Sequence, residues 1–164
     1  MKKQKGFSLI ELLIVVAIIL IIAAIAIPNL MRSRMAANES SAVGSLRTIN
    51  TAEVTYSTTY PAQRFAPALA NLGGAAASCG SGTTPTTAAA CLIDDVLAQG
   101  TKSGYSFTAN GATGNGGTVM VTYSSSAEPS APGQSGQRDF CSDQSGVIYA
   151  GASQGTCALG TGAL

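Results

Sequence analysis

The sequence of 164 residues contains no histidine and no tryptophan, and charged residues make up only 10% of it. Without histidine the chain cannot form a Ser–His or Cys–His nucleophile pair or a histidine-ligated metal site. Nine Lys and Arg against eight Asp and Glu leave a formal charge of +1, with no surplus to neutralise phosphates. We therefore expect no enzyme activity, no cofactor or metal, and no nucleic-acid partner.

Apolar residues, 46% of the chain, are concentrated near the N-terminus. Lys2, Lys3 and Lys5 precede an apolar stretch over 7–27, in which the residues of 12–27 are all apolar and include no glycine or proline. As a helix, the 21 residues would be about 31 Å long, which matches one bilayer core. The pattern predicts a transmembrane segment over 7–27, with the lysines keeping the N-terminus in the cytoplasm and the rest of the chain in the periplasm.

A cleaved secretory signal peptide is an alternative reading of this segment. The basic start is present, and Ala24, Ile25 and Ala26 offer a small-residue cleavage site. Glu11 argues against it, because a carboxylate inside the apolar region costs about 2.5–3.5 kcal/mol on insertion scales. The helical pattern also continues well past the supposed cut.

Glu11 is the most informative residue of the apolar stretch, because an acid within a membrane segment points to a function. If the chain were cut after Gly6, the new α-amine of Phe7 would lie four residues before Glu11, on the same helical face. The carboxylate could then neutralise an amine within one subunit or in its neighbour, and pairing between subunits would fix their register. The alternative is an acid that is merely tolerated near the membrane interface.

The run Gly6-Phe7-Ser8-Leu9-Ile10-Glu11-Leu12 resembles the processing motif of type IV pilins and type II secretion pseudopilins. The basic leader before it and the apolar helix after it are similar too, and the likeness extends over about the first 60 residues. It implies cleavage between Gly6 and Phe7 by prepilin peptidase and N-methylation of Phe7. It also implies that Glu11 engages the Phe7 amine of an adjacent subunit as the pilus machinery assembles a helical filament.

Pro28 follows the apolar stretch and is expected to kink or loosen the helix, because it lacks an amide proton and clashes with the carbonyl of Ala24. The resemblance implies a proline of this kind, with a role in subunit assembly. The alternative, that the helix ends at Pro28, conflicts with the pattern downstream. An apolar stripe within an arc of about 80° continues to Tyr56 and is broken by Glu53; it consists of Met31, Met35, Ala42, Leu46, Ile49 and Tyr56.

The stripe predicts that the second half of the helix is amphipathic and packs on a globular head, with Pro61 ending it. The predicted organisation is a cleaved leader over 1–6, a long helix over 7–60 and a head over 61–164. Charged residues along the helix could pair between neighbouring subunits or form a solvated face; they are Arg32, Arg34, Glu39, Arg47 and Glu53.

The head reads as a loop-rich region followed by strands. A helical turn is expected over 68–72 and a short helix over 91–98, ended by Gly100. Alternating residues and turn signals predict antiparallel strands over 105–108, 119–123, 138–141 and 147–149. The fold class is therefore α+β, a long N-terminal helix packed on a small antiparallel sheet as in pilins.

Four cysteines follow the membrane segment, which suits an oxidising compartment. Cys79, Cys91, Cys141 and Cys157 allow three pairings, and the residues alone leave these open. We favour Cys79–Cys91 and Cys141–Cys157, because each closes a short local loop. The Cys141–Cys157 segment resembles the disulfide-bounded C-terminal loop of many pilins, which implies either surface contacts and adhesion or a purely structural staple.

Two acidic pairs are weaker candidates for chemistry. Asp139 and Asp143 lack the ligand spacing of a calcium loop, and Asp94 and Asp95 would point about 100° apart on a helix. We therefore predict a structural subunit of a type IV pilus, held in the inner membrane before assembly and afterwards part of a periplasm-spanning or cell-surface pilus. The alternatives are a type II secretion pseudopilin, a minor pilin, or a membrane-tethered domain that does not assemble.

Overall fold

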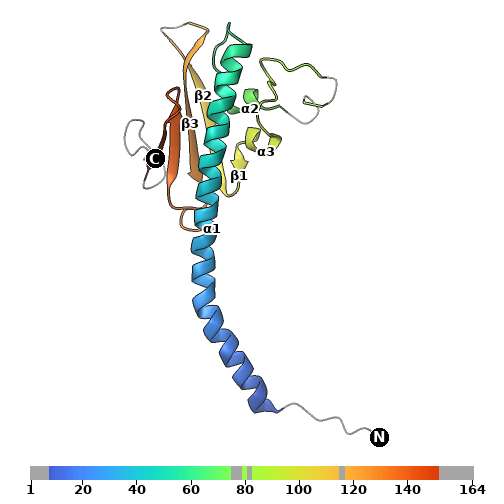
Figure 1. Cartoon of the computed structure of the whole chain (residues 1–164), viewed down its shortest axis with the longest axis vertical. Helices are drawn as coiled ribbons and strands as arrows, with labels where there is room; N and C mark the ends of the chain where they lie inside the picture. The colour runs from blue at the N-terminus through green and yellow to red at the C-terminus, as the bar shows by residue number, and fades with distance from the viewer. Residues whose placement is uncertain (1–7, 75–78, 81–82, 115–116, 152–164) are drawn as a thin grey trace. The chain divides into compact units, whose positions relative to one another are not determined.

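The computed structural model describes residues 8–74, 79–80, 83–114 and 117–151. The chain divides into two compact units, one ending at Arg34 and one beginning at Met35. The long helix α1, Leu9–Thr59, contributes to both units (Figure 1). Each unit is described separately below.

In the first unit, α1 runs through Pro28 without interruption. Leucine, isoleucine and alanine dominate this part. Leucine and alanine favour the helix intrinsically, and in lipid a helix satisfies the backbone amides within the segment. The prediction that the helix continues past Pro28 is confirmed. Within the described residues, α1 is the one helix that is long and apolar enough to cross a membrane.

In the second unit, α1 buries a stripe of side chains and ends at Thr59, two residues before Pro61, as predicted. Ala42, Leu46, Ile49 and Tyr56 of the predicted stripe are buried, whereas Met31 of the first unit is exposed. Glu53 does not break the stripe, because its side chain is buried within it. The full set of buried α1 residues is Ala42, Ser45, Leu46, Ile49, Asn50, Ala52, Glu53 and Tyr56.

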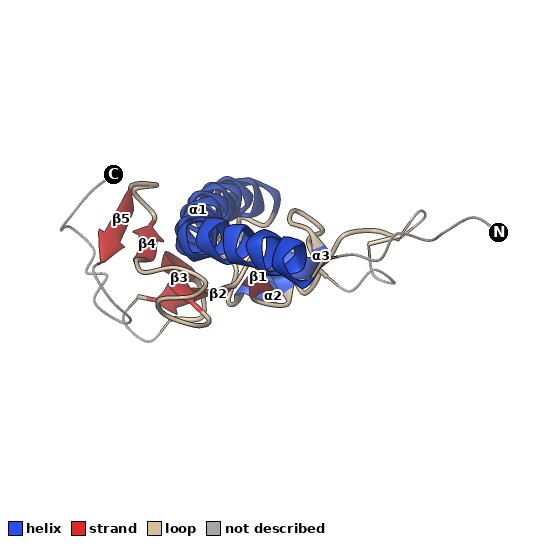
Figure 2. Ribbon diagram, turned by 90° about the horizontal axis from the view of Figure 1, so that it is seen from below, coloured by secondary structure: helices blue, strands red, loops and turns tan. Residues whose placement is uncertain are grey.

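Among the described residues of the head, five strands form an antiparallel sheet with sequential strand order. Its strands are β1 Thr101–Lys102, β2 Tyr105–Thr113, β3 Met120–Pro129, β4 Asp139–Asp143 and β5 Ile148–Gly151. One face of the sheet lies against α1 (Figure 2). Alternate residues point to that face, so Phe107, Ala127 and Phe140 align across three strands and join the core with Leu46 and Ile49. The predicted α+β fold is confirmed.

The short elements differ in part from the prediction. Helix α2, Leu69–Leu72, lies within the expected helical turn, but the expected helix over 91–98 is only α3, Asp95–Ala98. Cys91 has a positive φ of 56°, which interrupts a helix. Asp94 is the N-cap instead, since its carboxylate accepts a 2.7 Å hydrogen bond from the Leu97 amide.

Candidate functional site

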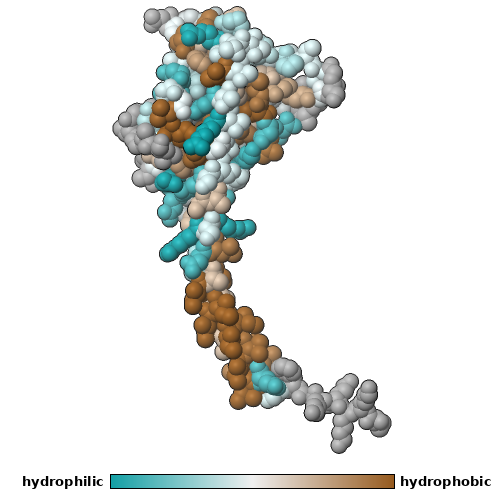
Figure 3. Space-filling model, viewed as in Figure 1, coloured by the Kyte–Doolittle hydropathy of each residue, from teal (hydrophilic) through white to brown (hydrophobic). Residues whose placement is uncertain are grey.

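The apolar part of α1 in the first unit has an uncovered surface. Its large side chains are roughly half to four-fifths exposed, and Figure 3 shows this segment as a continuous apolar surface. Monomeric soluble proteins rarely expose apolar patches beyond a few hundred Å². The segment therefore requires lipid or other helices around it. The exposed residues are Leu9, Ile10, Leu12, Leu13, Ile14, Val15, Val16, Ile18, Ile19, Leu20, Ile21, Ile22, Ile25, Ile27 and Leu30.

Glu11 lies in the first turn of α1 and its carboxylate contacts the start of the helix. The Ser8 amide donates a 3.2 Å hydrogen bond to Oε2 of Glu11. This contact satisfies one of the amides that a helix start leaves without a partner, and it is half of a capping box. The Ser-x-x-Glu spacing is the sequence signal for it. Gly6 and Phe7 lie outside the described residues, so cleavage, methylation and the amine–Glu11 pair stay predictions.

Hydroxyl groups along α1 in the second unit bond back to the helix itself. Thr48 donates to the Gly44 carbonyl, Thr51 to that of Arg47, and Thr55 to that of Thr51, at 2.9–3.1 Å. Such bonds to the preceding turn satisfy hydroxyls locally.

Glu53 is a fully buried acid between α1 and the loop that follows it. Its Oε2 accepts a 2.9 Å hydrogen bond from the Ala66 amide, while Oε1 has no partner among the described residues. Burial raises the pKa of Glu53 to about 7, against the smaller opposing effect of the Ala66 hydrogen bond. The prediction that Glu53 forms part of a solvated or intersubunit charged face is wrong, because the side chain faces the core.

Asn50 holds a buried polar network between α1, β3 and the β4–β5 turn. Its Oδ1 accepts a 3.1 Å hydrogen bond from the Tyr123 hydroxyl, and its Nδ2 donates to Ser142 Oγ at 2.8 Å and to the Gly146 carbonyl at 3.4 Å. Ser142 Oγ in turn donates to the Val147 carbonyl at 2.8 Å. The network fixes the turn relative to α1.

Glu39 joins α1 to the segment that leads into β4. Its Oε2 lies 2.8 Å from an Arg138 guanidinium nitrogen, and Oε1 accepts a 3.0 Å hydrogen bond from the Gln137 amide. Burial of Glu39 opposes ionisation, but these bonds outweigh it and lower its pKa. Glu39 therefore pairs within its own head, contrary to the idea that it pairs with Arg32, Arg34 or Arg47 of a neighbour.

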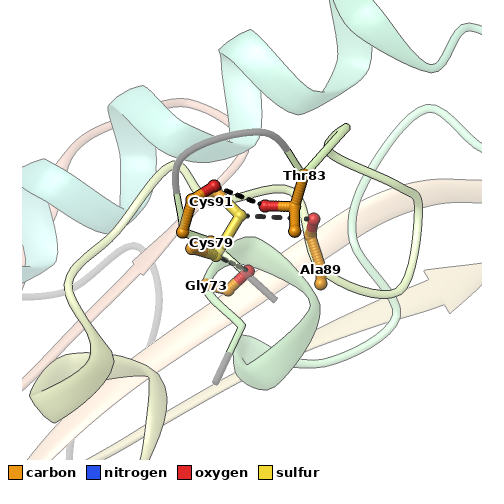
Figure 4. The surroundings of a disulfide bond; sticks show 6 residues. Gly73, Cys79, Thr83, Ala89 and Cys91 are labelled. Carbon is orange, nitrogen blue, oxygen red and sulfur yellow. Dashed lines mark hydrogen bonds between the residues drawn. A yellow bond between two sulfur atoms is a disulfide. The ribbon is translucent and has the colours of Figure 1, made fainter. Parts of the chain in front are cut away.

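The Cys79–Cys91 disulfide is present, as predicted, and closes a loop with a sequence separation of 12. Figure 4 shows it beside Gly73 and Ala89; Cys79 Sγ lies 3.8 Å from the Gly73 carbonyl oxygen. Cys141 is buried in β4. Cys157 lies outside the described residues, so the Cys141–Cys157 pairing stays a prediction.

The acidic pairs do not form a cluster. Asp139 and Asp143 lie at opposite ends of β4. Asp94 caps α3, and its Oδ2 lies 2.6 Å from Lys102 Nζ. Neither contact involves Asp95. In the part of the chain that the structure describes, no three His, Cys, Asp or Glu residues gather as metal ligands.

Comparison with known proteins addresses the N-terminal region. Residues 1–27 match the family described as the prokaryotic N-terminal methylation motif. The chain is 60% identical over 40 residues to the type IV wide pilus major component PilA4 of Thermus thermophilus, covering 24% of this chain and 30% of that protein. It is 46% identical over 54 residues to the type IV major pilin protein PilA of Myxococcus xanthus, covering 33% and 24%. No solved structure matches.

The matched region spans less than a third of the length of either relative. The motif, these relatives and the helix-on-sheet fold nevertheless agree, and they confirm the resemblance to the type IV pilin family. These findings support a pilin or a pilus-related subunit.

Proposed function

We propose that this chain is a structural subunit of a type IV pilus filament rather than an enzyme. The single observation that carries the proposal is the uncovered apolar surface of α1 in the first unit, with Glu11 at its start. Before assembly the inner membrane covers this surface; in the filament the same segments of other subunits do so. Lipid and helix are similarly apolar, so close packing and the pairing of Glu11 with a neighbour's Phe7 amine supply the specificity.

The leader over 1–6 is removed by prepilin peptidase, and Phe7 is N-methylated. The lysines of the leader keep the N-terminus on the cytoplasmic side while the head lies in the periplasm. Extraction into the filament needs an ATP-driven assembly machine, because so apolar a segment does not leave the bilayer spontaneously. A major subunit is favoured over a minor one, since both relatives carry the word major in their names.

The decisive experiment is electron microscopy of material sheared from cells that produce the chain, with mass spectrometry of the fibre protein. We expect surface fibres made mainly of this chain, starting at N-methylated Phe7. Fibres absent in the wild type, together with blocked export of secreted enzymes on deletion, would identify a pseudopilin. A mature chain that retains Lys2, Lys3 and Lys5 would overturn the processing step.

A further inference from the structure

The second unit has a groove on the outer side of α1. It has a volume of about 300 Å³ and is lined by Arg47, Thr48, Thr51, Ala52, Thr55 and Leu92. The threonine hydroxyls already donate to α1 carbonyls. The groove therefore combines one cation with apolar walls. Arg47 is exposed and forms no ion pair with any described residue.

The β4–β5 turn, residues 143–147, has the complementary chemistry. Asp143 uses one carboxylate oxygen to accept the Ser145 amide at 2.8 Å, which leaves the other oxygen for a partner. Residues 144–147 are exposed, and Val147 presents an apolar side chain next to this acid. An arginine and a carboxylate form strong charge-assisted hydrogen bonds. The apolar side chain of Val147 is of the right kind to pack against Leu92, which lines the groove.

Hydrogen bonds within the head hold the turn in its conformation. The Gly146 amide donates to the Asp143 carbonyl at 2.9 Å, and Asn50 binds the Gly146 carbonyl from α1. A preformed turn loses little conformational entropy on docking. It is thus better suited to contact a neighbour than a loop that must first be ordered.

The groove and the turn lie on different flanks of the same helix. Asn50, which holds the turn, is separated from Thr51, Thr55 and Thr48 by roughly 100–160° around the helix axis at 100° per residue. In Figure 2, α3 and β5 likewise lie on opposite sides of α1. One head can therefore offer its groove to one neighbour and its turn to another.

We propose that the β4–β5 turn of one subunit docks in the α1 groove of a second copy, with Asp143 bound to Arg47 and Val147 against Leu92. A contact between two different surfaces is heterologous, and repeated without closure it generates a helical filament. The inference rests on the proposed function and specifies which head surfaces meet in the filament.

Charge reversal in the full chain, in cells that assemble the filament, tests the contact. Sheared filament is measured relative to the subunit pool in the membrane. Arg47→Glu and Asp143→Arg should each reduce filament yield by about tenfold, because like charges then meet. The double variant Arg47→Glu/Asp143→Arg should restore it to within about twofold. Arg64→Glu and Glu128→Arg are matched controls that reverse other head charges and should leave the yield unchanged.

The outcomes separate the two proposals. If the unchanged chain forms no filaments, the proposed function fails. If it forms filaments but Arg47→Glu assembles normally, or the double variant does no better than the single ones, only the docking contact is overturned. A single variant whose membrane pool falls, without recovery in the double variant, also counts against the contact.

Discussion

Glu53 on α1 and Ala66 in the following loop are joined by a 2.9 Å hydrogen bond from the Ala66 amide to the Glu53 carboxylate, within the core of the head. The bond brings together residues 13 positions apart and fixes the loop between α1 and α2 against the helix. The second carboxylate oxygen has no partner among the described residues, so ionisation leaves a negative charge poorly solvated. The head is therefore sensitive to the protonation of one acid.

Stability should fall as the pH rises from about 4.5 to above about 7. The pKa of Glu53 is raised from 4.5 to about 7 by burial, so the folded state binds the proton more tightly than the unfolded state. The stabilisation is complete below pH 4.5 and is lost as the pH rises through 7, a change of about 3 kcal/mol or less. Urea unfolding of the full chain in detergent, followed from pH 5 to pH 8.5, measures it.

Glu53→Gln removes the titration and should flatten that pH profile. Glu39→Gln is the matched control, because the pKa of Glu39 is lowered and its loss should leave the Glu53 slope in place. A Glu53→Gln protein with the same slope as the wild type would refute the assignment.

Glu39→Gln should itself destabilise the head near neutral pH by about 1 kcal/mol, since it breaks a charge-assisted contact that is partly exposed on the Arg138 side. The difference from the wild type should shrink as the pH falls and Glu39 is protonated. Thermal unfolding at pH 7 and pH 3.5 measures both effects. An equal loss at the two pH values would contradict the role of the carboxylate charge.

Asn50→Ala should cost about 1–3 kcal/mol, because the hydroxyls of Tyr123 and Ser142 lose buried partners. Asn110→Ala, on the exposed face of β2, changes the same side chain without a buried partner and should cost under about 0.5 kcal/mol. Urea unfolding compares them. Hydrogen exchange at Gly146 should rise in Asn50→Ala, and unchanged protection there would separate the turn from the network.

Replacing both Cys79 and Cys91 by serine should destabilise the chain by about 3 kcal/mol, the loop-closure value for a 12-residue separation. Non-reducing peptide mapping of the wild type should recover the Cys79–Cys91 pair. Peptides in which Cys79 is joined to either other cysteine would contradict the structure.

Glu11→Ala should abolish filaments while the subunit still inserts in the membrane, because the carboxylate is needed for pairing and not for insertion. Ser8→Ala is a matched control, since the contact to Glu11 comes from the Ser8 backbone amide and survives the change. Immunoblots of sheared and membrane fractions measure both. Normal filaments in Glu11→Ala would remove the pairing step from the assembly model.

The sequence was sufficient to predict the helix, its end near Pro61 and the antiparallel sheet, because long periodic segments and prolines act locally. Helical periodicity places Glu53 within the apolar stripe, but its charge predicts exposure, because the partner that permits its burial is an amide in an irregular loop. The helix expected over 91–98 is too long because Cys91 has a positive φ, which the apolar pattern of the segment does not reveal. The role of Asn50 and the one proposed for Arg47 depend on which elements meet, and no local pattern encodes that.

The threonines that line the outer side of α1 donate hydrogen bonds from their hydroxyls to carbonyls of the preceding turn, which satisfies these donors within the helix. A helix flank that composition would class as hydrophilic can consequently be dehydrated without stranding a donor. Such a flank is compatible with water when the head is unassembled and with a water-free interface after assembly. A subunit that passes from one state to the other requires a surface that is stable in both.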